Sequence, residues 1–155
     1  MSVQQYDTAP EKASKNRLRL WLKLLKTTNL IEDELRRRLR NEFDRTLPRF
    51  DVMSALDRNP DGLKMSEISR LLQVSNGNVT GIVDRLVKDG LAERCNVPND
   101  RRASRVHLTQ KGRHEFVSLA DEHEKWVDEL LGCFDEKEVA ILFRLMDKIQ
   151  KEASE

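Results

Sequence analysis

The chain has 155 residues, of which 38% are hydrophobic and 35% are charged, so it is long enough to bury the core of one domain. Aromatic residues make up only 5%, which argues against binding single-stranded nucleic acid by base stacking. Its two cysteines have no disulfide or zinc-site spacing, and no apolar run approaches the roughly 18 residues of a membrane span. We therefore expect a cytoplasmic protein with no metal, no cofactor and no membrane contact.

The net charge of +1 conceals a segregation of charge along the chain. Residues 1–61 have a net charge of +3, residues 62–113 of +5, and residues 114–155 of −7. An excess of positive charge in the middle of the chain suggests a polyanionic partner for that region.

The N-terminal third predicts a long helix behind a short tail. Residues 1–14 are polar and predict a flexible tail, whereas apolar residues recur at helical spacing from about Lys15 to Asp44. Because these apolar residues lie on more than one side, this helix needs two neighbours. A second, short helix is predicted to begin at Pro48 and to end before the turn at residues 59–62.

Two short helices joined by a tight turn are predicted next, in a helix-turn-helix arrangement. Ser66 is the candidate N-cap of the first helix, which ends near Gln73. Ser75 is the candidate N-cap of the second helix, which is expected to end at Asp89 with Gly90 just beyond it.

The second of these helices has an unusual outer face. Its apolar face consists of four residues at helical spacing, namely Val79, Ile82, Val83 and Leu86. The opposite side is small or polar and consists of Gly77, Gly81, Asp84 and Lys88, flanked by Asn76, Asn78, Thr80 and Arg85. Small residues let a helix lie deep in a DNA groove, where amide, hydroxyl and basic side chains contact base edges and phosphates. The alternative is a solvated surface of weak helix propensity, although such a surface is more often rich in Glu, Lys and Ala.

A β-hairpin is predicted after this helix, because residues 91–97 alternate and residues 105–109 place Val106 and Leu108 inward. Cys95 and His107 are expected on its adjacent strands, as packed side chains without enough ligands for zinc. Thr109 can cap the next helix, and a last helix is predicted to start near Asp135.

The hairpin tip, residues 98–104, is predicted to be a basic loop that gathers Arg101, Arg102 and Arg105. An arginine on a protruding loop suits the narrow minor groove of DNA, where the potential is most negative. Asp100 is expected to pair with a neighbouring guanidinium and to fix its direction. The alternative is a mobile charged loop, whose ion pairs contribute only ~0–1 kcal/mol.

The run "VSNGNVTGIVDRLVKDGLAERCNVPNDRRASRVHLTQKG" closely resembles the MarR family of winged helix-turn-helix regulators. It has the family pattern "VT..VDRL...GL..R" in the second helix, "DRR" in the wing and "V.LT..G" at the last strand. The resemblance implies a mainly helical fold with a small β-wing, in the order helix, helix, strand, helix, helix, strand, strand, helix, helix. It also implies an intertwined homodimer with residues 15–47 and 114–155 as dimerisation helices and residues 48–113 as the DNA-binding lobe.

By the same resemblance, the chain is a sequence-specific regulator of transcription that binds double-stranded DNA at an inverted-repeat operator. Arg102 is then the minor-groove arginine and Asp100 its orienting partner. The residues expected to contact DNA are Ser75, Asn76, Asn78, Thr80, Arg85, Lys88, Arg101, Arg102 and Arg105.

The family commonly binds small aromatic acids, so the resemblance also implies a repressor that a small aromatic effector releases, in the subgroup that controls aromatic-acid catabolism. The first long helix carries a dense group of arginines that could hold the phosphates of an aryl-CoA thioester. The candidate effector residues are Trp21, Arg36, Arg38, Arg40 and Phe43. The alternative for the arginines is a solvated helix face with Glu32 and Glu34 as counter-charges.

Catalysis finds no support in the sequence. None of the three histidines, His107, His114 and His123, lies in a zinc-protease motif, and no phosphate-binding loop or nucleophile elbow is present. We therefore expect no enzyme activity. Two other functions remain open, an architectural DNA-binding protein that needs no ligand and a protein-interaction adaptor that does not bind DNA.

Overall fold

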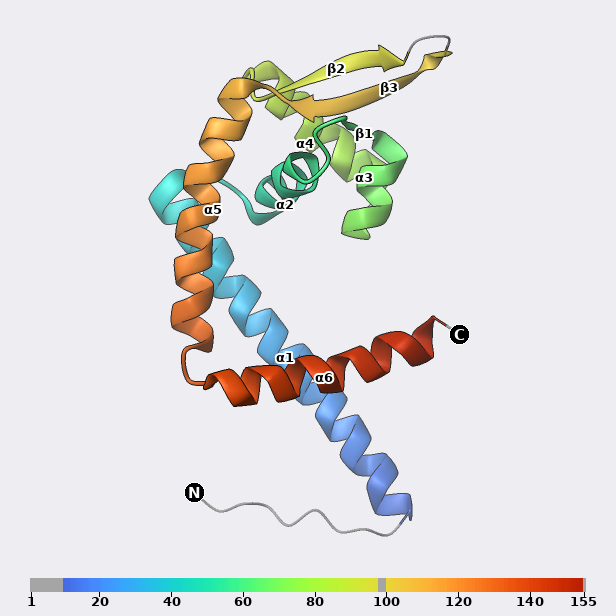
Figure 1. Cartoon of the computed structure of the whole chain (residues 1–155), viewed down its shortest axis with the longest axis vertical. Coiled ribbons are helices and arrows are strands. Elements are labelled where there is room, and N and C mark those ends of the chain that lie inside the picture. Colours follow the sequence, from blue (N-terminus) through green and yellow to red (C-terminus); the bar gives the residue numbers. More distant parts are fainter. Residues whose placement is uncertain (1–9, 98–99, 155) are drawn as a thin grey trace. The chain divides into compact units, whose positions relative to one another are not determined.

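The computed structural model describes residues 10–97 and 100–154, and the side chains of residues 12–97 and 104–154. The chain forms two compact units, residues 1–49 and residues 50–155. In the described ranges the structure is mostly helical with one three-stranded sheet, as predicted (Figure 1). The elements are α1 (Pro10–Phe43), α2 (Leu47–Asp57), β1 (Leu63–Lys64), α3 (Met65–Leu72), α4 (Asn76–Lys88), β2 (Ala92–Val97), β3 (Asp100–Leu108), α5 (Gln110–Leu131) and α6 (Glu136–Ala153).

The first unit consists mainly of α1, a continuous helix that begins five residues before the predicted start at Lys15. Pro10 opens it, a position where the missing N–H of proline costs nothing. Burial is confined to its C-terminal half, where Leu35 and Leu39 are buried. Six large apolar side chains between residues 18 and 30 of this helix are exposed, namely Leu18, Leu20, Trp21, Leu22, Leu25 and Leu30.

The core of the second unit lies between a small antiparallel sheet and the helices packed on it. The strand order is β1-β3-β2, with Leu63 opposite Val106 and Ala92 opposite Leu108. Val106 and Leu108 are buried, as predicted, which places that face of the hairpin against the helices. The largest fully buried side chains of this unit are Val52, Met53, Leu56, Ile68, Val79, Val83, Leu86, Leu91, Val106, Leu108 and Leu119.

The observed cap residues test three predictions about where helices begin and end. The prediction of Ser66 as the N-cap of α3 was wrong, because the N-cap is Lys64 and Ser66 lies inside the helix. The backbone N–H of Lys64 bonds to the Glu67 carboxylate at 2.7 Å, so an acidic side chain three residues on satisfies the helix start. Ser75 does cap α4, and Gly90 follows that helix with φ +72°, both as predicted.

The β-hairpin is longer than predicted, because β3 begins at Asp100 and not at Arg105. The register slips between Asn96, which pairs with Ser104, and Val97, which pairs with Asp100. A bulge of this kind adds residues to one strand without ending the ladder, so residues predicted to be loop belong to the strand. Sequence alternation cannot reveal a bulge, because the bulge interrupts the alternation itself.

A close junction joins the end of α4, the start of β2 and the start of α5. Thr109 caps α5 by accepting a bond from the Gly112 N–H at 3.0 Å, and its hydroxyl donates to the carbonyl of Gly90 at 2.7 Å. A Cβ on Gly112 would lie 1.9 Å from the carbonyl oxygen of Leu91. Glycine is therefore required at residue 112, which gives a physical reason for the glycine of the "V.LT..G" pattern.

The last two helices differ in how they are buried. On α5, Phe116, Leu119 and Trp126 are buried, and His123 stacks on Phe50 of α2 with ring centroids 4.5 Å apart. Helix α6 starts next to Asp135, as predicted, and Asp135 is its N-cap; no residue of α6 is buried. It exposes Ile141, Leu142, Phe143, Leu145 and Ile149. A helix with an apolar face and no buried residue indicates that a covering surface is missing.

Candidate nucleic-acid interface

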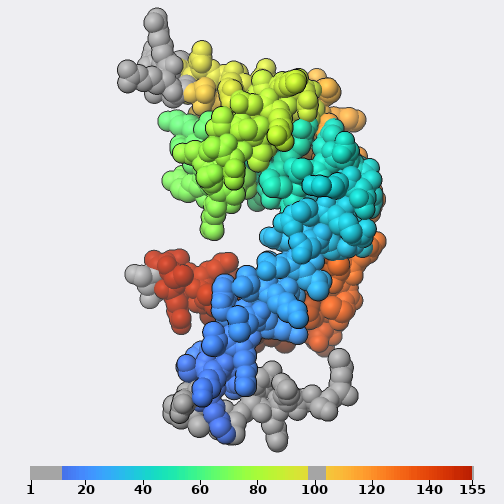
Figure 2. Space-filling model, turned by 180° about the vertical axis from the view of Figure 1, so that it is seen from behind, coloured from blue at the N-terminus to red at the C-terminus, as the bar shows by residue number. Residues whose placement is uncertain are grey.

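The outer face of α4 is the centre of the candidate site. Val79, Val83 and Leu86 are buried in the core, and this fixes the opposite face of the helix toward solvent. All the residues predicted to lie on that outer side are exposed, namely Asn76, Gly77, Asn78, Thr80, Gly81, Asp84, Arg85 and Lys88. In Figure 2 the region around α4 forms the yellow-green surface beside the yellow strand of the wing.

The two glycines of α4 are not required by any contact among the described residues. Both are in ordinary helical conformation, and a Cβ on Gly77 or Gly81 would meet nothing within 4 Å. A glycine inside a helix costs about 1 kcal/mol relative to alanine. Neither the backbone conformation nor the packing of the described residues requires glycine at these two positions.

Part of the predicted DNA-facing set also holds the helix-turn-helix together. Ser75 accepts a bond from the Asn78 N–H at 3.4 Å, and the Thr80 hydroxyl donates to the Asn76 carbonyl at 2.8 Å. The Ser69 hydroxyl of α3 donates to the Asn76 side-chain carbonyl. Only the Ser69–Asn76 bond joins α3 to α4, whereas the other two bonds stabilise the first turns of α4.

The wing arginines fall into two groups. Asp100, Arg101 and Arg102 lie in β3, and their side chains are outside the described residues. The prediction that Arg105 lies at the tip was wrong, because Arg105 lies in the sheet opposite Lys64 of β1. Its guanidinium donates to the carbonyl of Gly62 at 2.8 Å and lies 3.9 Å from the Glu67 carboxylate, so it ties β3 to β1 and α3.

The outer face of the hairpin carries the predicted pair of Cys95 and His107. The Cys95 sulfur lies 3.9 Å from Nε2 of His107, and the same nitrogen lies 2.9 Å from the Glu93 carboxylate. In the part of the chain that the structure describes, no group of three or more potential ligands is arranged to hold a metal ion. No described helix is both long and apolar enough to cross a membrane.

One contact of this surface was missed by the sequence analysis. Arg94 of β2 donates from Nη2 to the Asp84 carboxylate on the outer face of α4, at 2.6 Å. The pair joins the helix to the wing. The signal was present in the sequence, because both residues stand in the quoted "VDRL...GL..R" pattern, but spacing alone does not reveal that they touch.

The candidate effector residues on α1 do not form one cluster. At about 1.5 Å per residue, Trp21 lies roughly 22 Å along the helix from Arg36, so it is not beside the arginines. Arg36, Arg40 and Phe43 share one face by their spacing, whereas Arg38 points to the other side.

Carboxylates on α1 neutralise much of this positive charge. Arg36 pairs with Asp33 at 2.6 Å, and Glu34 pairs with Arg37 at 2.6 Å and with Arg38 at 2.7 Å. Hydrogen bonds from Arg37 and Arg38 lower the pKa of Glu34 to about 2, so this carboxylate keeps its charge at any physiological pH. These contacts favour the interpretation of this region as a solvated face with counter-charges.

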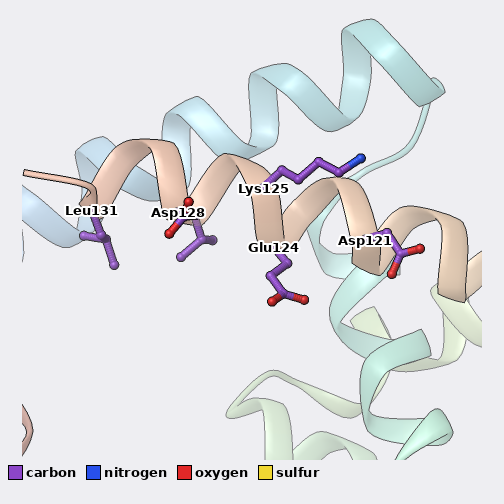
Figure 3. A pocket seen from close by; sticks show the side chains of 6 residues that line it. Asp121, Glu124, Lys125, Asp128 and Leu131 are labelled. Atoms are coloured by element: carbon purple, nitrogen blue, oxygen red, sulfur yellow. The ribbon is translucent and has the colours of Figure 1, made fainter. Parts of the chain in front are cut away.

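A surface hollow of about 570 Å³ lies along α5 (Figure 3). It is lined by Asp121, Glu124, Lys125, Val127, Asp128 and Leu131. Figure 3 shows the carboxylates on one side of the helix, whereas Lys125 extends away from them and pairs with Glu122 at 2.6 Å. An acidic lining does not suit an aromatic acid or a CoA thioester, so this hollow is not the expected effector site.

The fold and this surface define a winged helix-turn-helix protein of the DNA-binding class. A sequence profile described as MarR family matches residues 43–103. A MarR family transcriptional regulator from Silicibacter pomeroyi is 33% identical, with a TM-score of 0.75 over 91% of this chain and 97% of that one. The chain therefore belongs to the MarR family of transcriptional regulators.

Two further relatives extend this comparison. A cysteine-to-serine mutant of MarR from Escherichia coli, in complex with operator DNA, is 26% identical, with a TM-score of 0.75 over 86% of this chain and 95% of that one. The transcriptional activatory protein BadR of Rhodopseudomonas palustris is 28% identical over 140 residues, which is 86% of this chain and 79% of BadR.

Proposed function

We propose that the chain binds an inverted-repeat operator as a homodimer and represses a neighbouring operon. The observation that carries this proposal is the outer face of α4, where two glycines that the fold does not need stand among exposed Asn78, Arg85 and Lys88. In this arrangement α4 enters the major groove, and the two copies of α4 contact successive turns of the duplex. Counterions released from the phosphates supply much of the affinity.

The homodimer is supported by the exposed apolar side chains of α1 and of α6. On each helix, the residues of its own unit leave several large apolar side chains exposed to solvent. Phe143 of α6, for example, is 67% exposed. Monomeric proteins seldom expose contiguous apolar surface on this scale. Residues 15–47 and 114–155 are thus the dimerisation helices, and residues 48–113 are the DNA-binding lobe.

In the wing, Arg101 and Arg102 are proposed to enter the minor groove, with Asp100 orienting Arg102. The pairing of β2 with β3 as far as Val97 and Asp100 supports this arrangement, because it extends the ladder to the start of this segment. Arg105 acts differently, since its guanidinium holds the base of the wing to Gly62.

The proposed signal is a small aromatic acid or its CoA thioester, which releases the repressor in the cytoplasm. Arg36, Arg40 and Phe43 share one face of α1, and they are the residues we assign to the effector, whereas Trp21 and Arg38 are left aside. This assignment requires the effector to displace Asp33 from Arg36; otherwise the arginines form only a solvated face. By linkage, the ligand acts as an inducer only if it binds the DNA-free form more tightly. The name of BadR makes activation the second candidate for the sign of regulation.

A mobility-shift assay at moderate salt tests the function, with a duplex selected in vitro from a random library. We expect the selected duplex to bind in preference to a mixed-sequence duplex, and an aromatic acid or its CoA ester to release it. Release by neither compound class, with binding intact, identifies an architectural DNA-binding protein. Absence of any preferred duplex identifies a protein-interaction adaptor and contradicts the proposal.

A further inference from the structure

Asp84 is an anomaly on the proposed DNA-binding surface. It lies on the same outer face of α4 as Gly81 and Lys88, and its side chain is 54% exposed. A carboxylate at this place repels phosphate, so it weakens DNA binding unless it performs another task. Its neighbours on this face are otherwise small, amide-bearing or basic.

The partner of Asp84 is Arg94, and its position indicates what Asp84 does. Arg94 stands on β2 opposite Val106, which is fully buried, so the Arg94 side chain leaves the sheet on the side that faces the helices. Its Nη2 then meets the Asp84 carboxylate at 2.6 Å. The contact bridges the two parts of the surface that are proposed to bind different grooves.

Stability does not explain this pair. The two side chains are 38% and 54% exposed, and an exposed ion pair contributes only ~0–1 kcal/mol. The pair instead fixes the orientation of the Arg94 guanidinium. A guanidinium has five N–H donors in a rigid planar arrangement, and the bond to Asp84 holds that arrangement in place. Arg94 is left with further donors at the joint between α4 and the wing.

We propose that Arg94 is a phosphate-binding residue of the DNA interface and that Asp84 is the residue that positions it. Arg94 binds a phosphate of the DNA backbone between the major groove entered by α4 and the minor groove entered by the wing. This inference rests on the proposed function and adds to it a contact between the two reading elements. The Asp84 carboxylate reduces the electrostatic attraction to DNA, but it fixes the orientation of the Arg94 guanidinium.

The test compares four variants by fluorescence anisotropy, using the in vitro selected duplex across a series of salt concentrations. For Arg94→Ala, we expect roughly tenfold weaker binding and a salt slope reduced by about one. Asp84→Ala is expected to weaken binding even though it removes a negative charge near DNA. Glu93→Ala is the matched control, because Glu93 is an exposed carboxylate on the opposite face of the same strand, and its loss is expected to leave binding unchanged or tighter.

The fourth variant separates positioning from a merely structural role. The swap Asp84→Arg with Arg94→Asp restores an ion pair, so its melting temperature is expected to match that of the wild type. A purely structural pair also predicts restored DNA binding, whereas a phosphate contact at Arg94 predicts that binding stays weak.

Two sets of results overturn the proposal. If the wild type binds the duplex and Asp84→Ala tightens binding, or Arg94→Ala leaves the salt slope unchanged, or the swap binds like wild type, only this inference fails. If the wild type selects no duplex at all, the proposed function fails and this inference fails with it.

Discussion

Replacing Gly81 with alanine is expected to stabilise the protein and to weaken its binding to DNA. A Cβ at this position meets nothing within 4 Å, and the backbone is already helical, so the substitution adds no strain. Gly81 lies in the interior of α4, where the change from glycine to alanine gains about 1 kcal/mol. For a chain of this size, that gain raises the melting temperature by roughly 2–4 °C.

The same methyl group points to the surface proposed to approach the groove. If it displaces the helix from one base-edge contact, the loss is about 1–3 kcal/mol, which is roughly 5- to 140-fold in affinity. Gly77→Ala is expected to show the same loss of binding with a smaller gain in stability, because Gly77 lies in the first turn of α4.

Thermal melting and anisotropy with the selected duplex measure the two effects on one preparation. Ser118→Ala is the matched control, since Ser118 is exposed on α5 and its replacement raises helix propensity far from α4 in sequence. The reasoning is refuted if Gly81→Ala is stabilised and binds DNA as tightly as the control. An unstable Gly81→Ala variant refutes the first half of the argument.

Three other predictions concern the scaffold. Gly112→Ala should destabilise the protein by about 1–3 kcal/mol in urea unfolding, because its Cβ would overlap the Leu91 carbonyl; unchanged stability contradicts the junction described above. Burial lowers the pKa of His123, so the stability it contributes is complete above its unfolded value of 6.5 and is lost as the pH falls below that value. The loss of stability at low pH should be smaller in His123→Phe. Equal pH profiles of unfolding free energy for the wild type and this variant would contradict the burial of His123 as the cause. Phe143→Glu should dissociate the dimer in sedimentation analysis while Gln150→Glu, on the same helix, should not; a dimeric Phe143→Glu variant removes α6 from the interface.

The sequence predicted the type and order of the elements because their signals are local. The spacing of Val79, Val83 and Leu86 placed α4 in the core, and Ser75 and Asp135 marked helix starts that the structure confirms. The cap at Lys64 was missed, because there the backbone is satisfied by a carboxylate three residues on, and no side chain at the cap signals it.

The candidate site was harder to predict where it depends on contacts between elements. The contact of Arg94 with Asp84 crosses from a strand to a helix, and the placement of Arg105 depends on its register opposite Lys64. Neither follows from spacing along one element. Conversely, the arginines of α1 looked like a cluster in the sequence, whereas helical geometry turns Arg38 away from Arg36 and gives both of them carboxylate partners.

The central claim is that two copies of this chain present two α4 helices to one duplex with two-fold symmetry. Hydroxyl-radical footprinting on both strands of the selected duplex measures this most directly. The account predicts protection related by a two-fold axis over an inverted repeat, with half-site centres roughly 10 base pairs apart, one turn of the helix. Protection confined to one half-site, or repeated in the same direction along the duplex, would contradict it.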